Sequence, residues 1–213
     1  MLASNEIYYL NTALKGKYIY GIDPLKAKAM EDISCIGTEK SLLKKGYLKK
    51  DGSVDSLGII FLNYLYSYKN AENYIWADGK IIAFNSSPYL ITLSREGSNE
   101  YKVERKLKAQ IVAKIFKDKP FLLGDNKAEE EKKVVGVSKI VNILELKDES
   151  EVLYLRREKD ENISFYNVYF KEDNSLFKYD VIKKTLFLIN PRDAREEILN
   201  LFNIRRDEFK EKI

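Results

Sequence analysis

The sequence predicts an α+β protein with a central, mainly antiparallel sheet and flanking helices. Segments with the apolar spacing of helices and segments with the alternation of strands follow one another in blocks, without strict strand–helix–strand order. The strand-like runs are bounded by Asp, Asn and Lys clusters, which favour turns between antiparallel neighbours. Two successive blocks each run from strands into a helix, so the order of elements also allows a quasi-two-fold arrangement of two halves.

Residues 1–213 are expected to form one α+β domain. With 45% hydrophobic and 33% charged residues, the chain has enough apolar side chains for a core and too even a mixture of charges for disorder. An alternative division has two similar halves, about 1–123 and 134–213, joined by the charged segment 124–133 (GDNKAEEEKK). Within that segment, we interpret Glu129–Glu131 as the start of a solvated helix and not as a site.

The chain opens with an amphipathic helix. Ile7, Leu10 and Leu14 fall on one helical face, Ser4 is a suitable N-cap, and Gly16 can adopt the left-handed conformation that ends a helix. These residues predict a short helix with one buried face.

Two further helices are expected before residue 50. Asp23–Pro24 supplies a cap and a first-turn proline for a helix that reaches about Ile36. Thr38 and Gly46 can bracket the next one, and Asp51–Gly52 then turns the chain into a new apolar run.

A long core helix should follow this turn. Its apolar residues recur at helical spacing through the segment VDSLGIIFLNYLYSYKNA. They are Leu57, Ile60, Phe61, Tyr64, Leu65 and Tyr68.

Residues 72–96 contain two or three strand-like runs, with a hairpin signal at Asp78–Gly79 between Trp76 and Ile81. Residues 104–117 return to helical spacing, and the segment from Lys117 to Pro120 ends that helix.

The remainder of the chain is dominated by strands. The opening run VVGVSKIVNILEL fits either a helix or a strand, whereas the runs EVLYLRRE, ISFYNVYFKE, LFKYDVI and TLFLIN read as antiparallel strands. Asn190–Pro191 caps a last helix, with Ala194, Ile198, Leu201 and Phe202 along one face.

The residue inventory argues against most enzyme classes. The chain contains no histidine, which removes the commonest general base and zinc ligand and every Ser-His-Asp or Cys-His arrangement. No GxSxG, GxxxxGK[ST], GxGxxG or EF-hand pattern occurs. We therefore name no catalytic, cofactor-binding or metal-binding residue and expect a non-enzymatic protein, although an enzyme that uses only Asp, Glu and Lys stays open.

The single cysteine and the hydropathy pattern favour the cytoplasm. Cys35 lies between Ile33 and Ile36, so we interpret it as a small buried hydrophobe, and alone it forms no intrachain disulfide. The first residues lack the pattern of a signal peptide, and no apolar stretch is as long as a membrane span.

Aromatic residues are unusually abundant, at 12% of the chain. They are sufficient for both a core and an exposed binding surface. On a strand, Phe165 and Tyr169 would share one face while Tyr166 and Phe170 take the other. One set is therefore available for a partner, and the alternative is burial of both. The remaining candidates are Tyr8, Tyr9, Tyr64, Tyr66, Tyr68, Tyr74 and Trp76.

A winged-helix, DNA-associated regulator is the alternative function. The Asp78–Gly79 hairpin would be its wing, and Lys44, Lys45, Lys49 and Lys50 would contact phosphates. Against this, the net charge is only +4, and the basic stretch offers no Arg, Asn or Gln to read base edges. Nucleic acid is therefore the less favoured partner.

The N-terminal third resembles the EspG family of secretion chaperones and the short Firmicutes proteins encoded beside type VII secretion genes. An opening helix of the form E-x-x-x-L ends in glycine, and leucines precede a Gly-aromatic-Leu triplet. A D-G-x-V-D turn then opens a long apolar helix. The matching residues are Glu6, Leu10, Gly16, Leu42, Leu43, Gly46, Tyr47, Leu48, Asp51, Gly52, Val54 and Asp55.

This resemblance implies both a fold and a function. Family members have a quasi-two-fold α+β body with a central antiparallel sheet, and they bind secretion substrates at the tip of a helical hairpin. By resemblance, the chain would be a cytosolic chaperone or adaptor for a small helical type VII substrate, with the sheet face or an adjoining helix as the contact surface. The residues that bind the partner, the partner's identity and the oligomeric state do not follow from the sequence.

Overall fold

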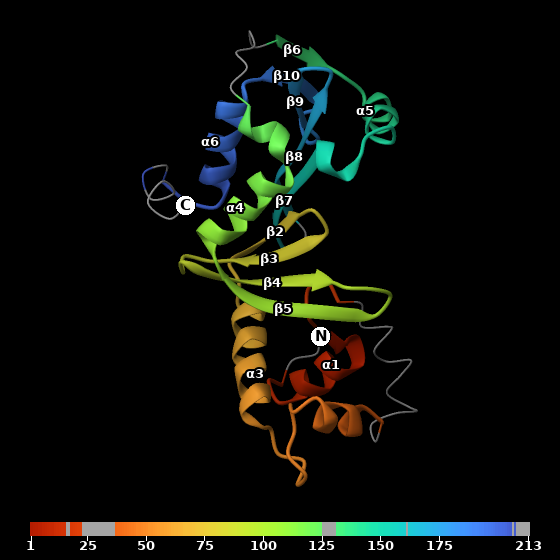
Figure 1. Ribbon diagram of the computed structural model, residues 1–213, viewed down its shortest axis with the longest axis vertical. Coiled ribbons are helices and arrows are strands. Elements are labelled where there is room, and N and C mark those ends of the chain that lie inside the picture. The colour runs from red at the N-terminus through yellow and green to blue at the C-terminus, as the bar shows by residue number, and fades with distance from the viewer. Residues whose placement is uncertain (16–17, 23–36, 125–130, 161, 206, 208–213) are drawn as a thin grey trace. The chain divides into compact units, whose positions relative to one another are not determined.

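The computed structural model describes residues 1–15, 18–22, 37–124, 131–160, 162–205 and 207. The strand pairs within it are antiparallel, and helices pack on the strands, which confirms the predicted α+β class. The contacts divide the chain into two units (Figure 1). The first comprises Met1–Glu72, Gly79–Asn85 and Leu90–Arg105, and the second comprises Asn73–Asp78, Ser86–Tyr89 and Lys106–Ile213. The quasi-two-fold relation of two halves stays a prediction.

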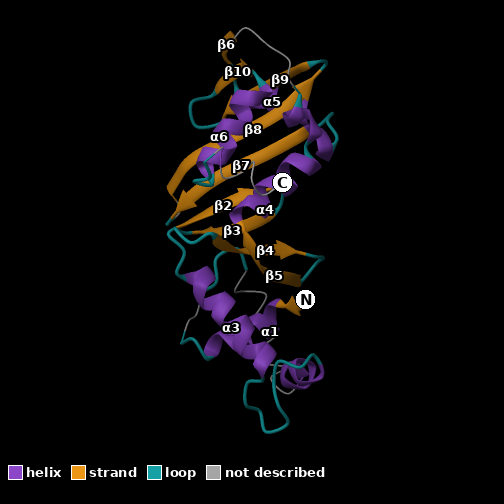
Figure 2. Ribbon diagram, turned by 60° about the vertical axis from the view of Figure 1, so that its left-hand side comes forward, coloured by secondary structure: helices purple, strands orange, loops and turns teal. Residues whose placement is uncertain are grey.

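The first unit joins four strands to the N-terminal helices. Its strand order is β1 (Leu2–Ala3), β5 (Glu100–Leu107), β4 (Tyr89–Arg95) and β3 (Lys80–Phe84). Its helices are α1 (Ser4–Thr12), a helix at residues 37–44, and α3 (Ser56–Lys69). Figure 2 shows α1 beside α3.

The predicted N-terminal helix is confirmed as α1, with a different cap. Ile7 and Leu10 are buried as expected, but the N-cap residue is Ala3 and Ser4 is the first helical residue. The Ser4 hydroxyl donates to Asn99 Oδ1 at 2.6 Å, and the Ala3 N–H donates to Glu6 Oε2 at 2.7 Å. Because the Glu6 side chain satisfies the N-cap amide, the serine is used for a tertiary contact instead.

The Glu6 carboxylate connects α1 to the helix at residues 37–44. It is almost completely buried, and it accepts from Ser41 Oγ at 2.6 Å and from Lys45 Nζ at 2.7 Å. Burial alone would raise the pKa of the Glu6 carboxyl. The hydrogen bonds from Lys45, Ser41 and the Ala3 N–H together outweigh this effect, so the pKa lies below its usual value.

The next turn is confirmed as predicted. Gly46 and Gly52 both have positive φ, and Leu48 and Val54 form an isolated bridge on either side of the Asp51–Gly52 turn. The predicted helix from Asp23–Pro24 to Ile36 lies outside the described residues, as do Gly16 and Cys35.

The predicted core helix is α3, but only part of its expected face is buried. Phe61, Leu65 and Tyr68 are covered, whereas Leu57 and Ile60 are exposed. Gly58 explains the close approach on the buried side, because a Cβ there would lie 2.4 Å from the Tyr47 carbonyl oxygen and 2.5 Å from Val54 Cγ1.

The prediction of a helix from residue 104 was wrong at its start. Residues 104–107 belong to β5, and α4 (Lys108–Asp118) begins only after Leu107. Strand pairing between β5 and β4 overrides the helical spacing there. The predicted strands at residues 72–96 are confirmed, and Asp78 and Gly79 both have positive φ, as in a type I′ turn.

The second unit contains a six-stranded antiparallel sheet. Its strand order is β2 (Asn73–Ala77), β7 (Val152–Lys159), β8 (Asn162–Glu172), β9 (Ser175–Asp180), β10 (Thr185–Ile189) and β6 (Glu131–Val134). The four strands predicted between residues 151 and 190 are confirmed. Glu129 and Glu130 lie outside the described residues, but Glu131 opens a strand and not a helix, because it pairs with Leu188 of β10.

Helices cover both faces of this sheet (Figure 1). α4 and α6 (Pro191–Leu201) lie on one side, and α5 (Val137–Leu144) lies on the other. Ala194, Ile198, Leu201 and Phe202 are buried as predicted. The remaining helical turns are η1 (Pro120–Leu123) and η2 (Glu149–Glu151).

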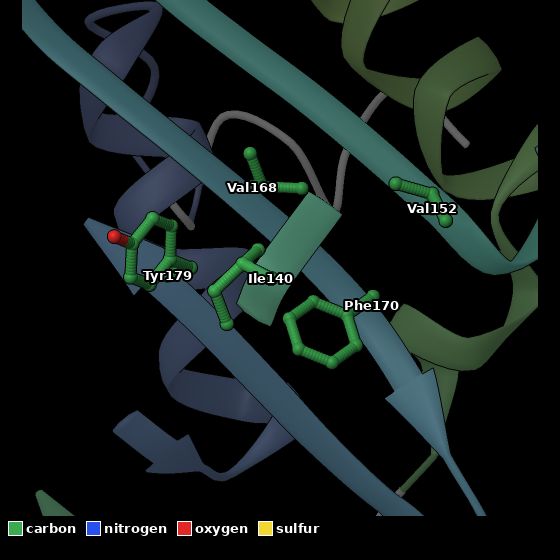
Figure 3. Close-up of a cluster of buried hydrophobic side chains, with 5 residues drawn as sticks. All are labelled: Ile140, Val152, Val168, Phe170 and Tyr179. Carbon is green, nitrogen blue, oxygen red and sulfur yellow. The ribbon is translucent and has the colours of Figure 1, made fainter. Parts of the chain in front are cut away.

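The ambiguous segment after residue 134 is helical, as α5, and packs on the strands through Ile140. Figure 3 shows Ile140 against Val168 and Phe170 of β8 and Tyr179 of β9. The Tyr179 hydroxyl donates to the Val135 carbonyl at 2.9 Å, which fixes the entry into α5. Tertiary packing therefore decides between helix and strand here.

Gly58→Ala should destabilise the first unit. The added methyl group must displace backbone, so we expect a loss of about 1–3 kcal/mol in the free energy of unfolding, despite the better helix propensity of alanine. Urea unfolding followed by circular dichroism measures it. The control is Gly136→Ala, where φ is −66° and no atom lies within 4 Å of the added Cβ. Equal effects of the two changes would contradict the assigned packing.

Glu6→Gln should destabilise the protein at pH 7 and have less effect in acid. The lowered pKa means that the ionised carboxylate stabilises the fold above the ordinary glutamate pKa, and that this contribution disappears as the pH falls through the folded-state value. The free energy of unfolding measured between pH 7 and pH 3 should therefore converge for the two proteins. Glu100→Gln, at an exposed position of the same unit, should show no such convergence.

Candidate binding site on the sheet face

The candidate site lies on the α5 side of the second-unit sheet, beyond the area that α5 covers. Alternate residues of a strand point to the same face, so Tyr154, Arg156 and Glu158 of β7 share the face of Val152. On β2, Trp76 pairs with Arg156 and Tyr74 pairs with Glu158, which places both aromatic rings on this face.

Three side chains form a line across the strands. Trp76 of β2 lies opposite Arg156 of β7, and Arg156 lies opposite Tyr166 of β8. We call Trp76, Arg156 and Tyr166 the Trp76 row. The Arg156 guanidinium carbon is 4.7 Å from the centroid of the Trp76 ring, a cation–π distance. Trp, Tyr and Arg are the residue types that contribute most to binding energy in protein interfaces.

Glu158 holds two members of the row in place. Its side chain is only 7% exposed, and its Oε1 accepts from Trp76 Nε1 at 2.9 Å. Its Oε2 lies 2.9 Å from Arg156 Nε. A buried carboxylate requires such partners, so the indole and the guanidinium are oriented before any ligand arrives.

Tyr154 extends the surface next to the row. Its side chain is 43% exposed. Partial burial raises the pKa of the Tyr154 hydroxyl, and Tyr166 and Asp78 add to the effect. The hydroxyl is therefore neutral at physiological pH, and it offers both a donor and an acceptor to a partner.

The sequence predicted the alternation of aromatics on β8, but not which of them would be exposed. Tyr169 and Phe170 point to opposite faces of the sheet and are both completely buried. At that end of β8, the aromatic side chains of both faces therefore belong to the core. Phe165 and Tyr166 remain partly exposed at the other end.

Arg156 and Glu158 were not predicted as site residues. Their alternation with Tyr154 in EVLYLRRE was visible in the sequence, but their pairing with Trp76 joins residues 82 positions apart. The spacing of residues along the sequence does not indicate a contact between strands so far apart.

The structure argues against the winged-helix alternative. The predicted wing includes β2, which is paired with β7 from Tyr74 to Ala77 and is therefore not free to enter a groove. Among the predicted phosphate-binding lysines, Lys45 is engaged by Glu6. Lys44, Lys49 and Lys50 are exposed.

A second polar cluster lies under α6 and has a structural role. The Tyr169 hydroxyl donates to Glu197 Oε2 at 2.6 Å, and Lys178 Nζ lies 3.1 Å from Glu197 Oε1. Burial raises the pKa of Tyr169 well above its usual value, and the Glu197 charge adds to this. These contacts of Glu197 hold α6 against β8 and β9.

Among the described residues, no group of three or more Asp, Glu, His or Cys side chains could hold a metal ion. A pocket of about 190 Å³ lies between residues 86–88, 107–109 and 203–204, and Lys108 is the one titratable side chain among its described lining residues. Ligand pockets are typically larger, at about 300–1,000 Å³. None of the helices in the described ranges is long and apolar enough to span a bilayer.

Glu158→Ala should disturb the Trp76 row in a way that fluorescence detects directly, because Trp76 is the single tryptophan of the chain. Without the carboxylate, the indole N–H loses its acceptor and Arg156 loses its ion pair. We expect emission at longer wavelength, stronger quenching by iodide, and a loss of about 1–3 kcal/mol in the free energy of unfolding. Exposed Glu145, changed to Ala, is the control, and an unchanged spectrum for Glu158→Ala would contradict the assigned geometry.

The chain belongs to the family described as "Domain of unknown function (DUF5081)", whose model matches residues 1–204. A search of curated proteins finds no match. Among solved structures, the chain is similar to the type VII secretion system chaperone EspG5 of Mycobacterium tuberculosis, determined in complex with a PE25–PPE41 dimer. The two chains are 10% identical with a TM-score of 0.47, and the match covers 92% of this chain and 93% of that one. The PE25–PPE41 dimer is bound by EspG5, and the similarity does not assign that ligand to the present chain.

Proposed function

We propose that this DUF5081 family member is a non-enzymatic protein-binding module of the cytoplasm, and that it acts as a chaperone or adaptor for a type VII secretion substrate. The Trp76 row is the observation that carries the proposal. It joins Trp, Arg and Tyr side chains on one sheet face, and Tyr154 lies beside it. Such a surface suits the apolar end of a helical protein.

Preorganisation supports binding at this face. The Glu158 carboxylate already orients Trp76 and Arg156, so a partner would lose less conformational entropy in ordering them. The strands that carry the row are paired along most of their length, which keeps the three side chains at fixed spacing.

The choice of a secretion substrate as partner rests on the N-terminal residues that resemble EspG-family chaperones. In the folded chain, several of these residues meet. Glu6 contacts Lys45 immediately before Gly46, and the Asp55 N–H donates to the Tyr47 carbonyl at 2.9 Å. These contacts give the matching residues a structural role in this chain.

Replacing Arg156 of the Trp76 row, or Tyr154 beside it, should weaken the partner complex. The candidate partners are small helical proteins encoded beside this gene, tested by co-purification and then by isothermal titration calorimetry. Arg156→Ala and Tyr154→Ala should each weaken binding by about tenfold or more, since truncation at an interface centre costs about 1.4 kcal/mol or more. Circular dichroism should show that both variants remain folded.

The matched control is Tyr18→Ala, which removes a 58% exposed tyrosine from the first unit. It should leave the affinity unchanged. Binding that is equally strong in all variants would exclude the sheet face as the site. Failure of every neighbouring candidate to bind would contradict the chaperone function itself.

A further inference from the structure

Lys119 is a buried lysine at the end of α4, and it joins three segments of the second unit. Its side chain is 6% exposed, and its Nζ lies 2.9 Å from Asp78 Oδ2. The same ammonium group donates a hydrogen bond to the carbonyl oxygen of Glu149, in the helical turn η2. These contacts connect α4 to the end of β2 and to the residues that lead into β7.

The backbone of Lys119 fixes the place from which this side chain extends. The Lys119 N–H donates to the Ile115 carbonyl at 3.0 Å and closes the last turn of α4. The Lys119 carbonyl accepts from the Leu122 N–H at 3.0 Å and begins η1. The ammonium group is therefore carried by a hydrogen-bonded junction between two helical elements.

Asp78 occupies the corner where β2 leaves β7. The two strands are paired as far as Ala77, which lies opposite Leu155. Continued by one residue, this register sets Asp78 opposite Tyr154. The pKa of the Tyr154 hydroxyl agrees with this closeness, because burial raises it and the charges of Tyr166 and Asp78 raise it further.

We propose that Lys119 is a positioning residue for the candidate binding site. It holds the end of β2, through Asp78, against the residues before β7, through Glu149. Trp76 lies two residues before this contact on β2, and Tyr154 lies beside it on β7. The spacing between the two aromatic side chains therefore depends on the ammonium group. This inference rests on the proposed function, because it concerns the same surface.

The ion pair also prepares this corner for an apolar partner. The Asp78 side chain is 31% exposed, so a partner that covers Tyr154 removes part of this carboxylate from water. Removing an unpaired charge from water opposes binding, whereas a carboxylate that already contacts an ammonium group loses much less. Because Lys119 supplies the opposite charge from within the protein, the partner needs no basic residue at this point.

Tryptophan fluorescence tests the positioning without any partner. Lys119→Met removes the ammonium group and keeps an unbranched apolar side chain, so the end of β2 should lose its connection to α4 and η2. We expect the Trp76 emission of the folded variant to shift and its quenching by iodide to increase. Lys114→Met is the control, because Lys114 pairs with Asp118 at an exposed position of the same helix. It should leave both values unchanged.

Asp78→Asn tests the same contact from its other side. Asparagine suits the positive φ of this residue before Gly79, so the hairpin should be kept while the carboxylate charge is lost. The Trp76 emission should shift in the same direction as in Lys119→Met. This variant leaves the buried side chain unchanged, so it also decides the matter where Lys119→Met does not fold.

Partner affinity separates positioning from a loss of stability alone. Calorimetry with the small helical protein that co-purifies with the unmodified chain should give a dissociation constant about tenfold higher for Lys119→Met. Gly58→Ala should bind as the unmodified chain does, because it perturbs packing in the first unit only.

Unchanged Trp76 emission in the folded variants would overturn the positioning role. So would an affinity that Lys119→Met leaves unchanged, or lowers no more than Gly58→Ala does. If no protein encoded beside the gene binds the unmodified chain, the proposed function fails, and the fluorescence comparison still decides whether Lys119 positions Trp76.

Discussion

The register of β7 with its two neighbours determines the candidate site. Pairing of Arg156 with Trp76 on one side and with Tyr166 on the other sets three large side chains in line. A shift of one residue in either pairing would turn Arg156 toward the opposite face of the sheet and bury a charge among the apolar residues under α4 and α6. The buried Glu158 opposes such a shift, because it keeps its partners only in the observed register.

A buried carboxylate also fixes the packing in the first unit. Glu6 connects the amide before α1 to Ser41 and Lys45, so two helices are fixed by one side chain. Close approach at Gly58 then brings the N-terminal end of α3 against Tyr47 and Val54. Tyr47 also meets Phe61 edge-on, with ring centroids 5.7 Å apart. Glu6 and Asp55 of the N-terminal motif therefore have structural roles, and so do Gly46 and Gly52, whose positive φ values permit the turns.

Local patterns in the sequence were sufficient for most elements. The spacing of Ile7 and Leu10, the turn at Asp78–Gly79 and the cap at Asn190–Pro191 each act over a few residues, and each was predicted correctly. Long-range pairing decided the rest: residues 104–107 became strand, and Glu131 joined an edge strand beside β10. For α3, the helical periodicity was predicted correctly. The core covers only part of the apolar face, however, so Leu57 and Ile60 are exposed.

The site was harder to predict for the same physical reason. Aromatic content indicated that a binding surface could exist, yet the row depends on contacts between β2 and β7, which are far apart in sequence.

Labelling Trp76 with 5-fluorotryptophan gives the most direct test of binding at the sheet face, because the chain has one tryptophan and therefore one fluorine resonance. That resonance should be followed during titration with an unlabelled helical secretion partner encoded beside the gene. Our account predicts that it shifts and saturates at the stoichiometry found by calorimetry, and that it becomes shielded from solvent. A complex that forms while the resonance keeps its position and its solvent exposure would contradict the account.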